Sequence, residues 1–442
     1  MSHAKPMAFD VVDTDEVALK THTACVVGDD FAINVDLLTR AIAQPLEPID
    51  HDVLLVIAAV CLVDRSVRRT NGTGWCRRLS IRVPVLKLHT WQHARTSLET
   101  LLARLTGDAW TFDFRQRQHI PQAQGHFEID QDHLQGSIVV PYSEGLDSFA
   151  AVAMLRVENP DAKVLLLNVR PSKKASKQLF RSSPTQTIGI PVTFTQKDHR
   201  ELSYRTRTFQ YFGVAALVWH KTKASKIVIG ESGIGCLGPG LVPVGVEQPV
   251  RGNSPFFIAD LKEFFHQLWD RTPVFEFLNL WRTKAMALAK SKPNLGGWQP
   301  TTSCSRMVRR QHPGATARQC GLCSGCVFRR MSVLAAGLKE SSPYFVDILS
   351  ESSLRDDLKS SDRSVARASI VTMNELALLA DKLDDVDAEI ALIARALGES
   401  QQRTRENLES LLLSYQQEWH MLLANLPQAS WVREIVYVQS EQ

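Results

Sequence analysis

The feature that most constrains the fold is an alternation of short apolar strands with helices in the middle of the chain. The strand and helix patterns follow one another at 137–142, 149–157, 163–169, 208–221 and 226–229. Strands this uniformly apolar avoid water on both faces, which is typical of a parallel sheet covered by helices on both sides. The sequence therefore predicts an α/β fold, a doubly wound parallel sheet, and 192–194 is expected to add a strand to it.

Two flanking regions have other patterns. Residues 1–130 contain strand patterns at 79–86 and 110–114 around a helix pattern at 94–105, which favours a small α+β N-terminal domain. A polar stretch, 116–136, is interpreted as the linker. Apolar residues at alternating four- and three-residue spacing over 379–397 and 408–426 predict an antiparallel helical hairpin. The expected domains are 1–130, 137–330 and a helical C-terminal extension, 341–442.

The charge is divided unevenly along the chain. From residue 341 onward there are nine Lys and Arg against seventeen Asp and Glu, so this region carries −8 and the preceding residues carry +12. A basic body favours a phosphate-bearing ligand or an acidic partner, while solvated surfaces without a partner are the plain alternative. The longest apolar run, Val53–Val63, has eleven residues, whereas a membrane-spanning helix needs about twenty. With no apolar leader pattern, we expect a cytoplasmic protein without a membrane partner.

A strand leading directly into a helix carries the first chemical signal. The strand at 137–142 runs into Ser143-Glu-Gly-Leu-Asp-Ser148, and a helix follows. Ligands bind at the carboxyl ends of parallel strands, and the amides of a helix N-terminus attract anions. The segment predicts a phosphate-binding loop, although it lacks the lysine of a Walker loop. An ordinary turn capped by Ser143 or Asp147 is the alternative.

Four cysteines carry the second signal. Cys304 is separated by fifteen residues from Cys320, and Cys323 and Cys326 follow at intervals that let their sulfurs reach one ion. Four thiolates are typical of structural Zn²⁺, while an iron–sulfur cluster or unligated thiols remain alternatives. Arginines without any acidic residue surround them, at 306, 309, 310, 318, 329 and 330. These arginines leave nucleic acid, ATP or an acidic protein open as partners, and a merely solubilising surface is the alternative.

Four segments resemble one family. Tyr142–Ser148 resembles the Ser-Gly-Gly-X-Asp-Ser signature of ATP pyrophosphatases. Tyr204–Thr208, with the helix and strand after it, resembles a segment of 7-cyano-7-deazaguanine synthase, the QueC family, and so do Thr283–Ala285 and the cysteine cluster. The similarity covers about 137–330. With its flanking regions, the chain resembles the longer QueC-like proteins of the Qat antiphage defence system.

The resemblance implies an adenine nucleotide α-hydrolase-like fold and an ATP-dependent, amide-forming ligase that releases AMP and diphosphate. Its substrates would be ATP, with Mg²⁺, and a 7-carboxy-7-deazaguanine-like carboxylate. Asp147, Ser148, Arg207 and Lys284 would be the catalytic residues. The nucleotide would be held by Ser143, Gly145, Leu146, Asp147 and Ser148. A protein from the defence operon is a candidate partner, and its amine a candidate acceptor in place of ammonia.

The chain departs from the family in two places. Glu144 stands where the family loop has glycine, which strains the turn by roughly 1 to 2 kcal/mol if a positive φ is required. The QueC segment after the second strand is replaced by 169–172, and the glycine-rich stretch 233–245 is expected to be a lid or a plain surface loop. Two other functions therefore remain open, a tRNA-modifying ATP pyrophosphatase and an inactive zinc-containing scaffold.

Overall fold

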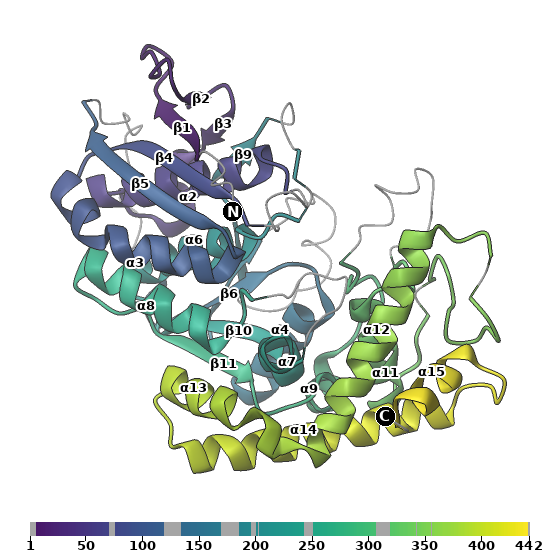
Figure 1. Ribbon diagram of the computed structural model, residues 1–442. Helices are drawn as coiled ribbons and strands as arrows, with labels where there is room; N and C mark the ends of the chain where they lie inside the picture. Colours follow the sequence, from purple (N-terminus) through teal and green to yellow (C-terminus); the bar gives the residue numbers. More distant parts are fainter. Residues whose placement is uncertain are drawn as a thin grey trace. The chain divides into compact units, whose positions relative to one another are not determined.

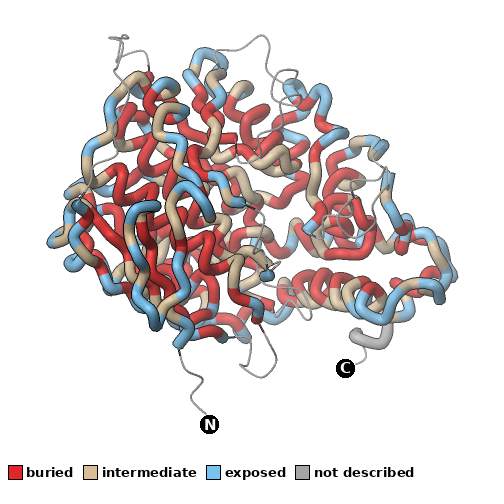
Figure 2. The backbone as a smooth tube through the Cα atoms, turned by 90° about the horizontal axis from the view of Figure 1, so that it is seen from above, coloured by how far each residue is buried: buried red, intermediate tan, exposed pale blue. Residues whose placement is uncertain are grey.

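The chain divides into two compact units, each assembled from several segments. The computed structural model describes residues 6–69, 76–118, 134–168, 185–195, 200–201, 203–242, 251–305, 319–341, 343–354 and 356–440. The first unit contains 1–143, 161–228 and 251–276, and the second contains 144–160, 229–250 and 277–442 (Figure 1). In each unit the buried residues gather in the interior, and exposed residues follow the outer turns (Figure 2). The domain boundaries expected from the sequence patterns stay predictions.

The four-stranded sheet of the first unit is parallel. Its order is β2(Thr23–Val26), β1(Met7–Val12), β4(Arg78–Val85) and β5(Ala109–Gln116). The β1·β2, β1·β4 and β4·β5 pairings are all parallel. A helix of nineteen residues, α3(Leu88–Thr106), connects β4 to β5, as parallel neighbours require. The small α+β domain expected for this region stays a prediction, and its four-stranded sheet is parallel throughout. Polar and apolar residues alternate in β5, as is typical of an antiparallel strand, so the sequence pattern did not indicate a parallel crossover.

The predicted parallel sheet in the middle of the chain is confirmed. Its order is β11(Phe275–Asn279), β10(Lys226–Ser232), β6(Ile138–Tyr142), β7(Val164–Asn168) and β8(Thr185–Gly189). The β10·β6, β6·β7 and β7·β8 pairings are parallel. Because β6 and β10 are parallel neighbours, the segments that follow them leave the sheet at the same edge.

The strand expected at 192–194 does not join this sheet. It forms β9(Val192–Phe194), which pairs antiparallel with β3(Phe31–Ile33) in a separate two-stranded sheet. Only Ile190 and Pro191 separate β9 from β8. A parallel crossover needs about a dozen residues, so two residues can only turn the chain away.

Further helices of the first unit include α1(Val35–Ile42), α2(Pro48–Ser66), α6(Arg207–Thr222) and α8(Pro255–Trp269). Residues 50–64 of α2 are buried throughout. The second unit begins with α4(Leu146–Glu158), and α9(Lys284–Ser291) follows β11. Within the described part of the chain, no helix combines the length and the apolarity that crossing a lipid bilayer requires.

The glycine-rich stretch after β10 is helical rather than a loop. Residues 233–241 form α7(Gly233–Leu241), and residues 243–245 lie outside the described part of the chain. A Cβ at Gly233 would stand 2.1 Å from the carbonyl oxygen of Leu280, and one at Gly235 would stand 2.2 Å from the carboxylate of Glu231. The glycines therefore allow close packing at the start of α7. Because glycine is typical of turns, the sequence pattern did not indicate this helix.

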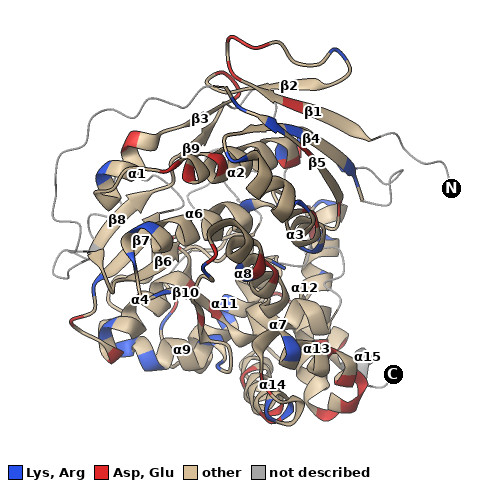
Figure 3. Cartoon of the chain, turned by 90° about the vertical axis from the view of Figure 1, so that its left-hand side faces the viewer, with Lys and Arg blue, Asp and Glu red and all other residues tan. Residues whose placement is uncertain are grey.

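The C-terminal region is helical, as predicted. Within 341–442 its helices are α12(Ser360–Leu378), α13(Asp387–Leu397), α14(Gln401–Ala424) and α15(Trp431–Ser440), and α11(Ser324–Ala335) precedes them. The helix expected over 379–397 begins only at Asp387, after the short turns η5(Leu379–Asp381) and η6(Leu383–Val386). Acidic residues at its start favour a helix N-terminus there, because they complement the helix dipole (Figure 3).

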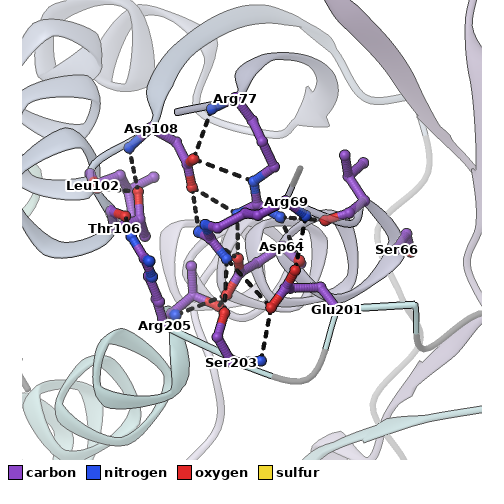
Figure 4. A network of polar contacts seen from close by, with 12 residues as sticks. Asp64, Ser66, Arg69, Arg77, Leu102, Thr106, Asp108, Glu201, Ser203 and Arg205 are labelled. Atoms are coloured by element: carbon purple, nitrogen blue, oxygen red, sulfur yellow. Dashed lines mark hydrogen bonds and ion pairs between the residues drawn. The ribbon is translucent and has the colours of Figure 1, made fainter. Parts of the chain in front are cut away.

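A buried network of charges holds the segment before α6 against the sheet of the first unit (Figure 4). Arg77 contacts Asp64 at 2.5 Å and Asp108 at 2.6 Å, and Arg69 contacts the same two carboxylates at 3.3 and 2.5 Å. Asp64 also accepts hydrogen bonds from the amide and the hydroxyl of Thr206, both 2.9 Å. Charged residues at helical spacing, such as Asp64 and Arg69, are typical of a solvated helix end. Both side chains are instead fully buried and paired with each other.

Candidate functional site

The turn between β6 and α4 is the starting point of the site. Gly145 is the N-cap of α4, with φ −80° and no side-chain cap, so neither Ser143 nor Asp147 caps the helix. The preceding residue, Glu144, has φ +58°. The condition for strain at this position, a positive φ, is therefore met, and a non-glycine residue adopts it at a cost of roughly 1 to 2 kcal/mol.

The first turn of α4 has the geometry of an anion-binding helix N-terminus. The first backbone bond of the helix runs from the amide of Phe149 to the carbonyl of Gly145, 3.0 Å, so the amides of residues 146–148 precede the helical ladder. The side chain of Leu146 is fully buried, so only its backbone can serve a ligand. The hydroxyl of Ser148 donates to the carbonyl of Gly145, 3.0 Å, and thereby tightens this turn.

Three charged side chains meet beside this turn. Nζ of Lys284, the first residue of α9, lies 2.8 Å from a carboxylate oxygen of Asp147 in α4. The carboxyl of Glu231, near the end of β10, is hydrogen-bonded to that of Asp147. Lys284 is buried, whereas the Asp147 side chain remains 19% exposed. The predicted residues Asp147 and Lys284 are thus brought together, and Glu231 joins them.

Their proximity shifts two pKa values. Burial, the charge of Asp147 and the hydrogen bond to Asp147 raise the pKa of Glu231 to about 7. Burial alone would lower the pKa of Lys284, but the charges of Asp147 and Glu231 raise it above its ordinary value. Near neutral pH the group can therefore take up or release one proton at Glu231 while Lys284 stays charged.

Small residues allow the strand and the helix to approach. A Cβ at Gly230 would lie 2.8 Å from Cβ of Ala151 and 3.3 Å from the carbonyl oxygen of Asp147. At Gly235, a Cβ would collide with the Glu231 carboxylate at 2.2 Å. Gly230 and Gly235 thus leave the space in which Glu231 reaches Asp147.

Side chains from the C-terminal helices α11 and α14 contact Lys284 and the residue before it, Thr283. The ring of Phe328, on α11, has its centroid 4.4 Å from Nζ of Lys284. Thr283 is the N-cap of α9, and its hydroxyl accepts a hydrogen bond from the amide of Met286, 3.1 Å. The same hydroxyl is hydrogen-bonded to the carboxylate of Glu418 on α14, a residue that is 7% exposed.

The four predicted cysteines come together as a buried cluster that can hold a metal ion. The sulfurs of Cys304, Cys320, Cys323 and Cys326 lie within 4.8 Å of one another. Sγ of Cys326 is 3.7 Å from that of Cys320 and 3.6 Å from that of Cys323. A tetrahedral ion with metal–sulfur bonds of about 2.3 Å requires sulfurs about 3.8 Å apart. The spacing of the described sulfurs therefore fits four ligands of one ion.

Backbone geometry supports the cluster. The amides of Leu322 and Cys323 donate to Sγ of Cys320 at 3.3 and 3.4 Å, which stabilises a thiolate. Gly321, which lies between Cys320 and Leu322, has a φ of +79°. A Cβ at this position would stand 1.7 Å from the carbonyl oxygen of Val346. Likewise, a Cβ at Gly325 would stand 2.3 Å from the carbonyl oxygen of Ser303. The two glycines let the chain close around the sulfurs.

The remaining predicted residues either belong to the first unit or lie outside the described residues. Arg207 begins α6 in the first unit, where its guanidinium is hydrogen-bonded to the Tyr211 hydroxyl and lies 5.2 Å from that ring. Ser143 ends a segment of the same unit, and the ligand roles of both stay predictions. Of the arginines near the cysteines, 306, 309, 310 and 318 lie outside the described residues, as do 169–172.

Two site residues were missed by reading the sequence. Glu231 follows three buried residues of β10, and a carboxylate at the carboxyl end of a parallel strand is a signal that could have identified it. No comparable signal marks Glu418, because in the sequence of α14 it is one of several polar residues beside the apolar positions. Comparison of the chain with protein-family models, curated proteins and solved structures finds no match.

Proposed function

We propose that the protein is an ATP-dependent, amide-forming ligase with an adenine nucleotide α-hydrolase-like fold. The observation that carries the proposal is the meeting of Asp147, Glu231 and Lys284 beside the N-terminus of α4. An anion-binding helix end next to a buried lysine and two carboxylates suits a nucleotide phosphate chain. The resemblance of the same segments to QueC enzymes supports cleavage between the α- and β-phosphates.

The reaction has two steps. A carboxylate oxygen of the acceptor, by resemblance a 7-carboxy-7-deazaguanine-like compound, attacks the α-phosphorus, and the bond to the β-phosphate oxygen breaks to release diphosphate. An amine nitrogen then attacks the acyl carbon, and the bond to the AMP oxygen breaks. Adenylation is needed because a free carboxylate is unreactive toward amines. The proton lost by the amine needs a base, and Glu231, with a pKa of about 7, suits this role.

Each residue has a distinct part in this proposal. The amides of Leu146, Asp147 and Ser148 would bind the diphosphate as it leaves, and the ammonium of Lys284 would stabilise its developing charge. The carboxylate of Asp147 offers a hard oxygen ligand of the kind that Mg²⁺ prefers. Mg²⁺ would neutralise phosphate charge there. The part of Arg207 rests on the resemblance alone.

The cysteine cluster is proposed to hold Zn²⁺ in a structural role. Four sulfurs fill a tetrahedral coordination sphere and leave no position for substrate, which is typical of structural zinc. Thiolates of this kind persist in a reducing compartment, so we place the protein in the cytoplasm. Antiviral defence, and an operon protein as partner, are proposed from the resemblance.

Product analysis tests the proposed function. The protein is incubated with ATP labelled at the α-phosphate, Mg²⁺, 7-carboxy-7-deazaguanine and ammonia, and nucleotides are separated by chromatography. We expect AMP and diphosphate from the wild type, and a loss of about 100-fold or more in the Asp147→Ala and Lys284→Met variants. Lys290→Met, which removes a surface lysine from the same helix, is the control. Formation of ADP, or equal rates in all variants, would exclude the proposal.

A further inference from the structure

The geometry points to Glu418 as a positioning residue, which holds Lys284 in place through the hydroxyl of Thr283. The inference rests on the proposed function for its catalytic meaning, but the contacts that carry it do not. Glu418 lies on α14, more than a hundred residues after the lysine that it would control. The C-terminal helices would then be part of the active centre.

The first step of the argument is the capping of α9. The Thr283 hydroxyl accepts the amide proton of Met286 at 3.1 Å, and so it must turn its own proton elsewhere. A carboxylate oxygen of Glu418 receives that proton in a buried hydrogen bond. Because Thr283 is fully buried, water cannot replace this acceptor. Glu418 thereby fixes the side-chain rotamer of the N-cap residue.

The second step is the position of Lys284. It is the first residue after the N-cap, so the orientation of the N-cap decides where its backbone leaves the turn. Nζ is held between the Asp147 carboxylate at 2.8 Å and the Phe328 ring at 4.4 Å. A shift of the cap would therefore loosen both contacts.

The third step is the rigidity of α14 itself. The indole of Trp419 donates to the side chain of Asn374 on α12 at 3.0 Å, and Tyr415 donates to the carbonyl of Met373 at 3.2 Å. Cδ2 of Leu411 would lie 2.6 Å from a Cβ at Gly233, where α7 begins. Glu418 is thus presented from a helix that is anchored on both sides.

The second carboxylate oxygen of Glu418 strengthens the case. It is buried, and no hydrogen-bond partner is found for it among the described residues. A leucine or methionine would fill such a position without the desolvation cost of a carboxyl group. The cost of burying this carboxyl group indicates that it has a specific role. Within the described chain, the only polar contact found for it is with Thr283, the N-cap of α9.

Amine labelling tests the proposal without requiring ATP turnover. Full-length protein is treated with acetic anhydride, and the acetylation rates of Lys284 and Lys290 are compared by peptide mass spectrometry. We expect Glu418→Ala to raise the relative rate at Lys284 about fivefold to tenfold, the size of effect that loss of one buried hydrogen bond produces. Glu418→Gln keeps an acceptor oxygen and should restore the wild-type rate. Glu409→Ala, an exposed change on the same helix, is the control.

A second pair of variants covers failure of Glu418→Ala to fold. Thr283→Val removes the hydroxyl at nearly constant volume, and Thr283→Ser keeps it, so only the valine variant should expose Lys284. Where ATP is cleaved, Glu418→Ala should lower kcat with little change in the KM for ATP. Labelling of Lys284 at the wild-type rate in folded Glu418→Ala or Thr283→Val would overturn the proposal. A wild type that cleaves no ATP, with the labelling pattern as expected, would refute only the ligase function.

Discussion

The backbone amide of Thr302 donates a hydrogen bond to the carbonyl oxygen of Glu144, 3.1 Å away. This contact joins the segment that leads to Cys304 with the strained turn that begins α4. The neighbouring Thr301 is held in turn by Arg329 of α11, whose guanidinium donates to its carbonyl and its hydroxyl, both at 2.9 Å. Gln319, which donates to the carbonyl of Thr301 at 3.1 Å and accepts from Sγ of Cys326 at 3.8 Å, links these contacts to the cysteine cluster.

Removal of the proposed Zn²⁺ should consequently affect the turn as well as the cluster. We expect Cys323→Ala, or treatment with a strong chelator, to lower the free energy of unfolding by more than about 3 kcal/mol. Nucleotide binding, measured by isothermal calorimetry, should weaken before the protein unfolds. The exposed Cys76 provides a control, since Cys76→Ala should change neither quantity. Elemental analysis that finds iron, or no metal, would contradict the zinc assignment.

Strain at Glu144 can be measured by comparing two variants that both remove its side chain. Glycine adopts a φ of +58° without the steric cost that alanine incurs. Glu144→Gly should therefore be more stable than Glu144→Ala by about 1 kcal/mol in urea unfolding. Equal stabilities would mean that the turn relaxes to a negative φ when the side chain is lost.

The pKa of Glu231 should respond in opposite directions to its two neighbours. Lys284→Met removes a positive charge and should raise this pKa above about 7, whereas Asp147→Asn removes a negative charge and should lower it. Carbon-13 NMR of labelled glutamate carboxyls measures both shifts. Lys290→Met, which breaks a surface pair with Glu158, should leave the Glu231 signal unchanged.

The buried network of the first unit should dominate the acid stability of that unit. Burial alone would raise the pKa of Asp108, but hydrogen bonds and the charge of Arg77 hold it below its ordinary value. Its contribution to stability is thus complete above about pH 4 and is lost as the pH falls through the lowered pKa. Asp108→Asn should cost about 3 to 5 kcal/mol at pH 7, because two arginines lose a buried partner.

A matched variant on β5, the strand that follows Asp108, separates the network from a general charge effect. Asp113, on β5, is 72% exposed and pairs with Arg82 at 3.3 Å. Asp113→Asn should cost less than about 1 kcal/mol. Similar losses in the two variants, measured by denaturant unfolding at pH 7, would show that the network is not a major source of stability.

The sequence predicted what depends on short stretches of chain. Apolar runs located β6, β7 and β10, and the spacing of four cysteines located the cluster, because a strand and a ligand spacing are both local patterns. It did not predict that β9 leaves the sheet, since pairing depends on the length of the connection as well as on apolarity. The buried pairing of Arg69 and Asp64 was also missed, because charge by itself suggests solvent.

The site was predicted in part for the same reason. Asp147 and Lys284 carry recognisable motifs, whereas Glu231 and Glu418 acquire their meaning only from neighbours that are distant in sequence. A pKa near 7 at Glu231 arises from the approach of three chain segments, which no single segment contains. Long-range contacts of this kind set the limit of what sequence patterns can indicate.

The order of the site residues along the chain has a consequence for protein synthesis. Asp147, Glu231 and Lys284 emerge from the ribosome in that order, and Glu418 emerges long after them. A nascent chain can therefore close the sheet well before the cap of α9 finds its carboxylate partner. Ribosomes that stall or terminate before residue 418 would release chains whose lysine is not yet held. The proposed ligase activity would thus require translation to continue past residue 418.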